Sequence, residues 1–450
     1  MTKLFQYQKD GIRRLIHFGG RGCLFDEMGL GKTIQALAVA KYFDAFPCVV
    51  VCPASVKYTW EAEASQHYGI RGIVLEGTKP PRRGLRLPAQ LWILNFDILH
   101  KWVQWLREMG IKCAIIDECQ NISNRETIRT KSVKMLCEDV PHVIALSGTP
   151  LMNRPAELYP TINLVCPDEF NGFFDFGMRY CEPKKVRGEF QFKGAANLDE
   201  LNQRLNDSCM VRRLKRDVLI ELPSKMRRQV PVQLRDFDQY EEARDNFVKW
   251  IYEKHPTRAK TALYNQAFTQ LGYLLRLTAK LKFRAVCNWI DDFLGGTDEK
   301  LIVFGVHKAM VKSLNKRYLD RSVLIDGDVP SKIRKLMVDQ FQRDVKTRLF
   351  IGNGAATAGI TLTAASTVAF VEYFWRPADH LQAEDRPHRI GQHKTVWVNY
   401  LTAIGTIEER MCQIVQRKQE HCRKTLDGEH AGEELAVCDL LIEHLKKGKR

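Results

Sequence analysis

Short apolar runs alternate with longer amphipathic stretches along both halves of the chain. The runs are rich in β-branched residues and occur at 47–53, 91–96, 112–118 and 142–148 in the first half, and at 300–306, 322–327, 348–353, 366–372 and 396–401 in the second. Apolar strands separated by helices are typical of parallel sheets that are covered on both faces. The pattern therefore predicts an α/β fold with two parallel sheets.

The segment from about 195 to 295 has no comparable series of strands. It carries amphipathic helical stretches instead, such as DQYEEARDNFVKWIYEK. We therefore predict helical insertions between the two sheets. The expected domains are a first α/β domain at 1–225 with a small helical insertion at about 160–215, a helical bridge or protrusion at 226–295, and a second α/β domain with C-terminal helices at 296–450.

Composition narrows the class of protein. A chain of 450 residues with 45% apolar residues can hold two or three domains. Its 69 Lys and Arg against 53 Asp and Glu give a net charge of +16, which favours a polyanionic partner such as nucleic acid. No stretch approaches the roughly 18 apolar residues of a membrane helix. Thirteen cysteines without CxxC pairs indicate buried thiols. We expect a soluble, intracellular protein with no membrane partner.

The segment DEMGLGKTIQALAVA at 26–40 has the features of a phosphate-binding loop that opens a helix. Gly29 and Gly31 let backbone N–H groups approach phosphates, and Lys32 is placed to meet the outer phosphates. We expect the Thr33 hydroxyl to be a ligand for Mg²⁺. Asp26 stands where the strict pattern has a glycine, so the match is to a shortened form of the loop.

Two carboxylates, Asp117 and Glu118, follow the apolar run IKCAII. At the carboxyl end of a central strand they would lie beside the phosphate loop, where one can hold Mg²⁺ and the other can activate water. The segment SGTP at 147–150 ends another strand, and its hydroxyl groups could sense the γ-phosphate. A solvated turn is the ordinary alternative for the acidic pair.

Arg386 and Arg389 lie three residues apart in QAEDRPHRIGQ, so we expect them on one face of a helix. A pair of guanidinium groups can neutralise charge on a transferring phosphoryl group. In isolation, each of these segments also has an ordinary structural explanation. Their presence together in one chain favours a nucleotide-hydrolysing site.

Eight segments then resemble, in order, the Swi/Snf-type branch of helicase superfamily 2. They are LFQYQKDGI, DEMGLGKT, CPASVKYTW, DECQ, ALSGTPLMNRPAELY, RRLKRDVLIELPSK, NGAATAGITLTAAS and QAEDRPHRIGQ. The resemblance implies two RecA-like lobes, an ATP site in the cleft between them, and ATP hydrolysis with Mg²⁺ coupled to movement along double-stranded DNA. It further implies that Gln8 reads adenine, that Gly359 contacts the nucleotide, and that DNA is contacted by Ser55, Lys57, Asn353 and Thr357.

Within that branch the chain looks most similar to annealing-helicase and fork-remodelling members, which implies that it acts on branched DNA. A protein-displacing remodeller of linear duplex, or a DNA-binding scaffold that no longer hydrolyses ATP, are the alternatives. One departure is Gln120, where many relatives have histidine. The compact layout predicts a monomer of bacterial or phage origin in the cytoplasm, or in the nucleus if the host is eukaryotic.

Three further segments leave two interpretations open. The basic runs KPPRRGLR at 79–86 and RRLKRD at 212–217 are DNA contacts or solvated faces. The phenylalanine-rich FNGFFDF at 170–176 indicates core packing or a wedge at a DNA junction.

Overall fold

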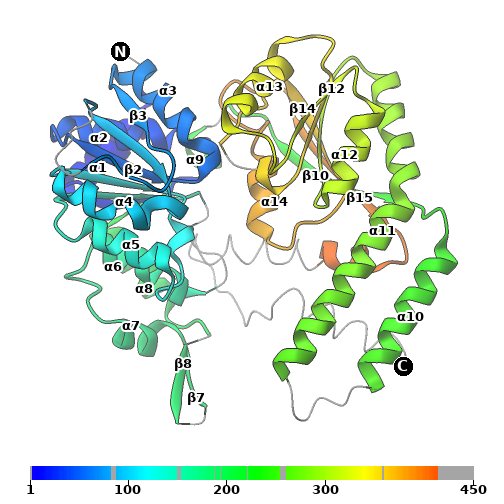
Figure 1. The fold of residues 1–450 in the computed structure, drawn as a ribbon, viewed down its shortest axis with the longest axis horizontal. Coiled ribbons are helices and arrows are strands. Elements are labelled where there is room, and N and C mark those ends of the chain that lie inside the picture. The colour runs from blue at the N-terminus through cyan, green and yellow to red at the C-terminus, as the bar shows by residue number, and fades with distance from the viewer. Residues whose placement is uncertain are drawn as a thin grey trace. The chain divides into compact units, whose positions relative to one another are not determined.

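The computed structural model describes residues 3–413 apart from 83–87, 149, 151–153, 187, 193, 220, 254–259 and 357–358. The chain forms two compact units that divide between Leu222 and Pro223 (Figure 1). Each unit is built around one parallel sheet, and each is described separately below.

The first unit contains a seven-stranded parallel sheet in the order β3-β4-β2-β5-β6-β1-β9. In chain order its strands are β1 (Arg21–Leu24), β2 (Cys48–Cys52), β3 (Gly72–Val74), β4 (Leu91–Asn95), β5 (Cys113–Asp117), β6 (His142–Leu146) and β9 (Met210–Val211). Its larger helices are α1 (Gln6–His17), α2 (Lys32–Tyr42), α3 (Lys57–Tyr68), α4 (Phe96–Glu108), α5 (Ile128–Cys137), α6 (Tyr159–Val165), α7 (Phe173–Tyr180) and α8 (Leu198–Ser208).

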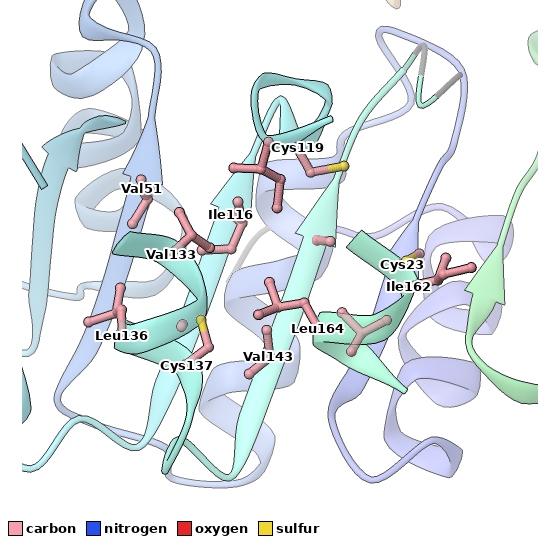
Figure 2. Packing of buried hydrophobic residues seen from close by; sticks show 14 of the residues in the cluster. Cys23, Val51, Ile116, Cys119, Val133, Leu136, Cys137, Val143, Ile162 and Leu164 are labelled. Atoms are coloured by element: carbon pink, nitrogen blue, oxygen red, sulfur yellow. The ribbon is translucent and has the colours of Figure 1, made fainter. Parts of the chain in front are cut away.

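Both faces of this sheet are buried, which explains its fully apolar strands. Successive residues of β2 point to opposite faces: Val50 packs among residues of α1, α2 and α3, whereas Val51 packs among residues of α4, α5 and α6. Figure 2 shows the second of these faces, with Val133 of α5 packed against the strands. Among the described cysteines only Cys166 is not fully buried, as the sequence predicted.

The second unit contains a six-stranded parallel sheet in the order β10-β15-β14-β11-β13-β12. Its strands are β10 (Lys225–Val232), β11 (Lys300–Phe304), β12 (Ser322–Ile325), β13 (Leu349–Gly352), β14 (Ala365–Phe370) and β15 (Val396–Ala403). Its helices include α10 (Phe237–Glu253), α11 (Lys260–Gly296), α12 (Lys308–Arg317), α13 (Ser331–Arg343) and α14 (Pro377–Glu384). The two-sheet α/β prediction is confirmed. Although α11 is long, no helix in the described part of the chain is apolar and long enough to cross a membrane.

Strands also occur where the sequence predicted none. β9 extends the first sheet, and β10, inside the expected helical bridge, pairs with β15 over its whole length. The residues of β10, KMRRQVPV, are mostly half-buried or exposed, and the strand lies at the edge of the sheet. Pro231 is tolerated at such an edge. The apolar-run criterion missed this strand because an edge strand need not be apolar.

The insertion expected at about 160–215 is not purely helical. Between α7 and α8 the chain forms an antiparallel hairpin of β7 (Pro183–Val186) and β8 (Glu189–Phe192). Figure 1 shows the hairpin projecting from the first unit beyond α7.

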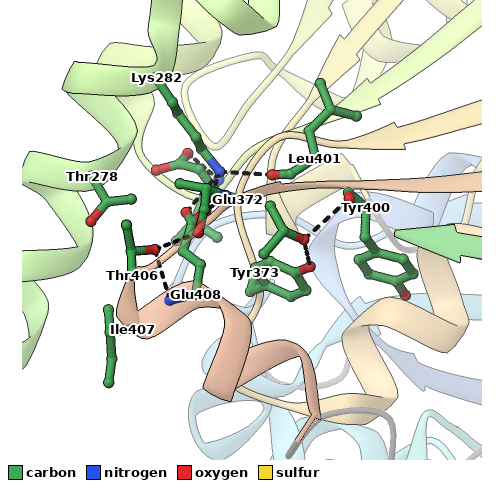
Figure 3. Close-up of polar contacts among 12 residues, drawn as sticks. Thr278, Lys282, Glu372, Tyr373, Tyr400, Leu401, Thr406, Ile407 and Glu408 are labelled. Atoms are coloured by element: carbon green, nitrogen blue, oxygen red, sulfur yellow. Dashed lines mark hydrogen bonds and ion pairs between the residues drawn. The ribbon is translucent and has the colours of Figure 1, made fainter. Parts of the chain in front are cut away.

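A buried ion pair in the second unit joins Lys282 of α11 to Glu408, in the helical segment that follows β15 (Figure 3). The Lys282 ammonium donates to both carboxylate oxygens of Glu408, at 2.7 and 2.6 Å, and to the Leu401 carbonyl at 3.0 Å. Glu408 also accepts a hydrogen bond from the Ala403 backbone N–H at 3.0 Å. The two side chains are 0% and 2% exposed, so water contributes little to their solvation. Each buried charge is therefore stabilised mainly by its ion-pair partner.

His380 gives the second unit a dependence on pH. Its ring is fully buried among Phe370, Phe374 and Tyr400, and this burial lowers its pKa to about 4. Below about pH 6.5 the His380 imidazole becomes protonated in the unfolded chain but stays neutral in the folded unit. The free energy of unfolding therefore falls by up to about 1.4 kcal/mol per pH unit between pH 6.5 and 4. When the pH falls from 6.5 to 5.5, we expect the His380→Gln variant to lose about 1 kcal/mol less unfolding free energy than the unsubstituted protein. Urea unfolding at the two pH values measures this difference.

The exposed His393 provides the matched control for this prediction. His393→Gln should leave the pH dependence of unfolding as it is in the unsubstituted protein. Identical pH dependence for both variants would show that His380 does not contribute.

Candidate active site

The phosphate loop connects β1 to α2 and has the backbone conformation that its glycines allow. Gly29 and Gly31 adopt φ angles of 86° and 75°, which other residues rarely tolerate. A Cβ at Gly31 would also lie 2.5 Å from the side-chain nitrogen of Gln8. The loop ends at the N-terminus of α2, where the first backbone N–H groups have no partner within the helix. This end of the helix therefore favours an anionic ligand.

Lys32, Thr33 and Gln8 surround that loop. The Lys32 ammonium donates to the carbonyl oxygens of Asp26 and Glu27, at 2.8 and 3.3 Å. Gln8 donates to the Leu30 carbonyl at 3.2 Å, which holds α1 against the loop. Thr33 is half-buried in the first turn of α2. The structure thus brings together the residues for which the sequence predicted contacts with nucleotide and Mg²⁺.

Asp26, which replaces a glycine of the strict loop pattern, holds the phosphate loop in place through buried hydrogen bonds. Its carboxylate is fully buried and accepts hydrogen bonds from Arg213 Nε at 2.9 Å and from Gln35 Nε2 at 3.0 Å. The Lys215 backbone N–H donates to Glu27 Oε2 at 2.7 Å, and the Lys215 side chain is 4% exposed. In the run RRLKRD, Arg213 and Lys215 are therefore used inside the first unit and are not part of a solvated face.

The acidic pair lies at the carboxyl end of β5. Asp117 accepts hydrogen bonds from the Trp60 indole N–H at 2.8 Å and from the Glu118 backbone N–H at 2.9 Å. Burial raises the pKa of Asp117 to about 7, with a further contribution from the charge of Glu118, while Lys32 acts in the opposite direction. Two adjacent carboxylates in such surroundings are favourable ligands for a divalent cation, which compensates their charge.

Glu118 is connected to the SGTP segment through Gln120. Gln120 Nε2 donates to Glu118 Oε2 at 2.7 Å, and the Ser147 hydroxyl donates to Gln120 Oε1 at 2.7 Å. An amide can donate and accept at the same time, so Gln120 can link Glu118 to Ser147. Met28 of the phosphate loop packs on Gly148, where a Cβ would lie 2.4 Å from the Met28 side chain. Thr149 lies outside the described residues.

Arg386 and Arg389, expected on one helical face, are not on a helix. α14 ends at Glu384, and turns follow it. The reason is Pro387, which lacks an N–H and disfavours a helical conformation of the residue before it. Both arginines nevertheless contact one segment. Arg386, 2% exposed, donates to the Ile360 carbonyl at 3.2 Å, and the half-buried Arg389 donates to the Thr361 hydroxyl at 3.3 Å.

The remaining predicted residues differ in accessibility. Gly359, next to the segment that the arginines contact, has a φ of 71°. Asn353 is 8% exposed and its side-chain oxygen accepts from the Ala355 N–H at 3.0 Å. Lys57 is 7% exposed and donates to the Leu75 carbonyl at 3.4 Å, and its contact with DNA stays a prediction. Ser55 is half-buried, and Thr357 lies outside the described residues.

Two protein-family models match the chain. The SNF2-related domain matches residues 7–287, which is more than half of the chain and includes the phosphate loop and the acidic pair. The helicase conserved C-terminal domain matches residues 281–391, which include both arginines. The chain belongs to the SNF2-related family. The predicted family is thereby confirmed.

Curated members of the SNF2-related family match nearly the whole chain. The SWI/SNF-related matrix-associated actin-dependent regulator of chromatin subfamily A-like protein 1 of Xenopus tropicalis is 35% identical over 93% of this chain and 44% of its own length. The DNA annealing helicase and endonuclease ZRANB3 of Mus musculus is 34% identical over 95% of this chain and 41% of its own length. A solved Sulfolobus solfataricus SWI2/SNF2 ATPase core in complex with dsDNA matches with 25% identity and a TM-score of 0.45, over 93% of this chain and 92% of that chain.

This SNF2-related chain thus spans less than half the length of the two curated relatives it matches. Both come from animals, so they give no support to the bacterial or phage origin and the cytoplasmic location that the compact layout predicted.

Proposed function

We propose that this SNF2-related chain is an ATP-driven motor that moves along double-stranded DNA and remodels branched DNA, by annealing, branch migration or fork regression. The observation that carries the proposal is the site of the first unit, where the phosphate loop with Lys32, the Asp117–Glu118 pair and Ser147 meet. Similarity over 95% of the chain to a protein named as a DNA annealing helicase supports the branched substrate. The endonuclease part of that name is not carried over, because the match covers 41% of that protein.

The proposed cofactors are ATP and Mg²⁺, and the residues present fit both. The backbone of Gly29 and Gly31 and the Lys32 ammonium would hold the phosphates, and Gln8 would contact adenine. Thr33 and Asp117 would hold Mg²⁺, which neutralises charge on the phosphates during hydrolysis. The raised pKa of Asp117 supports this assignment, because a cation would replace the proton that burial favours.

Glu118 is the proposed general base. Its hydrogen bond from Gln120 restrains the carboxylate, and Gln120 is restrained in turn by Ser147. A positioned carboxylate can take a proton from water as the water attacks the terminal phosphate. Through this chain of contacts, a movement of the SGTP segment would change the orientation of the base.

Arg389 is the proposed stabiliser of the transferring phosphoryl group, since it is more accessible than Arg386. We expect Arg389→Ala to reduce kcat for ATP hydrolysis by about 1000-fold and to change ATP affinity by only a few-fold, because the contact develops in the transition state. Steady-state kinetics with a nucleotide-binding titration measures both quantities. Arg343→Ala, at an exposed position of α13, is the matched control. A large loss of affinity with unchanged kcat would contradict the assigned role.

The function is tested by following a labelled four-way junction during incubation with ATP or a non-hydrolysable analogue. Movement of the branch point only with ATP supports the proposal. If the chain displaces proteins from linear duplex but leaves junctions unchanged, the remodeller alternative holds instead. A monomeric state and, for a eukaryotic host, a nuclear location remain predictions.

A further inference from the structure

The β7–β8 hairpin and α7 carry an aromatic surface that the mechanism above does not use. Phe174 and Phe190 are 55% and 42% exposed, with ring centroids 5.8 Å apart in an edge-to-face arrangement. Phe192 packs against the Phe174 ring and against Gly177, so it supports the two exposed rings from the side of α7. The Lys185 ammonium lies 5.9 Å from the Phe190 ring centroid. Two neighbouring large rings, one on α7 and one on the hairpin, that are held half-exposed indicate a binding surface.

A basic cavity of about 530 Å³ lies beside this surface, between α5 and α6. Its lining includes Lys131, Lys134 and Arg125, one carboxylate, Glu138, and the Phe173 ring, over which the Arg125 guanidinium stacks at 3.4 Å. Lys131 also forms an exposed ion pair with Glu126 at 3.2 Å. The cavity has the size of a site for one nucleotide-sized ligand. Phe173 lines the cavity and also contacts Phe192, with ring centroids 5.3 Å apart, so Phe192 connects the cavity to the aromatic surface.

We propose that this cavity and the rings of Phe174 and Phe190 bind an unpaired strand of branched DNA. The cations would meet backbone phosphates and the rings would stack on splayed bases, which is the combination that sequence-independent single-strand sites use. Paired duplex keeps its bases inside the stack and cannot use the rings. The surface therefore distinguishes a fork or junction from linear duplex. This inference rests on the proposed function and specifies that the unpaired strand is the part of the substrate that the chain recognises.

The test measures, by fluorescence anisotropy at one salt concentration, how tightly the chain binds two labelled DNA molecules. One is a fork that carries an unpaired arm, and the other is a linear duplex. The unsubstituted chain should bind the fork more tightly. Phe174→Ala with Phe190→Ala should weaken fork binding by roughly tenfold, as expected for the loss of a stacked base, and leave duplex binding within about twofold. Lys131→Glu with Lys134→Glu should also remove the preference for the fork and should make fork binding less sensitive to salt.

Two controls isolate the surface. Met135→Ala removes an exposed apolar residue of α5 that does not line the cavity. Lys41→Glu with Lys101→Glu makes the same change in net charge as the cavity variant, at exposed positions of α2 and α4. Neither control should alter the preference for the fork.

The outcomes separate this inference from the proposed function. Duplex-stimulated ATPase activity that is unchanged in all variants shows that they fold and that the motor works. With that activity intact, retention of fork preference in both surface variants, or its absence in the unsubstituted chain, overturns the inference alone. If no DNA stimulates ATP hydrolysis by the unsubstituted chain, the proposed function itself fails.

Discussion

Glu118→Gln will reduce DNA-stimulated ATP hydrolysis by at least about 100-fold, the effect expected when a general base is lost. The substitution keeps the size of the side chain and its ability to accept the hydrogen bond from Gln120, so the loop should remain in place. Duplex DNA binding should stay within a few-fold, because phosphate contacts elsewhere determine it. Steady-state ATPase rates and duplex-binding titrations measure the two effects.

Glu126→Gln is the matched control, since Glu126 is an exposed carboxylate eight residues further along the chain. It should leave the ATPase rate unchanged. Lys32→Ala should abolish hydrolysis in the same way as Glu118→Gln, because both act on one reaction. Substantial turnover by Glu118→Gln would remove Glu118 as the base and would leave only its role in the hydrogen-bond chain to Ser147.

Lys282→Met is expected to have the largest effect on stability, a loss of about 3–5 kcal/mol in the free energy of unfolding of the second unit. The substitution leaves the Glu408 carboxylate buried without its cation. Burial already raises the pKa of Glu408, and Lys282 is the main group that opposes this rise. Denaturant unfolding monitored by circular dichroism measures the loss.

Lys280→Met is the control, because Lys280 is exposed on the same helix two residues earlier. It should change stability by less than about 0.5 kcal/mol. Lys282→Met combined with Glu408→Leu should recover part of the lost stability, since no unpaired charge remains. A double variant that is no more stable than Lys282→Met would assign the loss to packing and not to charge.

Most central strands of both sheets could be predicted because they are buried on both faces and therefore apolar throughout, but β1 was missed because its four residues, RGCL, form no such run. β2 is the clearest case, since residues on each of its faces are fully buried. β10 could not be found in this way, because an edge strand with charged residues such as Arg227 and Arg228 has no apolar run. The β7–β8 hairpin was missed for a similar reason, since it is short and largely exposed.

At the candidate site, the sequence predicted the residues whose roles depend on local order along the chain. Lys32 follows its glycines and Asp117 ends its strand, so neighbouring residues were sufficient to place them. Contacts between distant segments could not be predicted. Arg213 reaches Asp26 across 187 residues of sequence, and the only signal was an acidic residue in place of a loop glycine. Lys57 was assigned to DNA from the resemblance, and the sequence does not show that it is only 7% exposed.

The measurement that tests the central claim most directly is the steady-state ATPase rate with no nucleic acid, single-stranded DNA, linear duplex, and a fork or four-way junction, all at one salt concentration. A motor that moves along duplex and remodels branches predicts strong stimulation by duplex and more by the junction. Stimulation by single-stranded DNA alone would indicate a strand-tracking helicase, and no stimulation by any DNA would contradict the account.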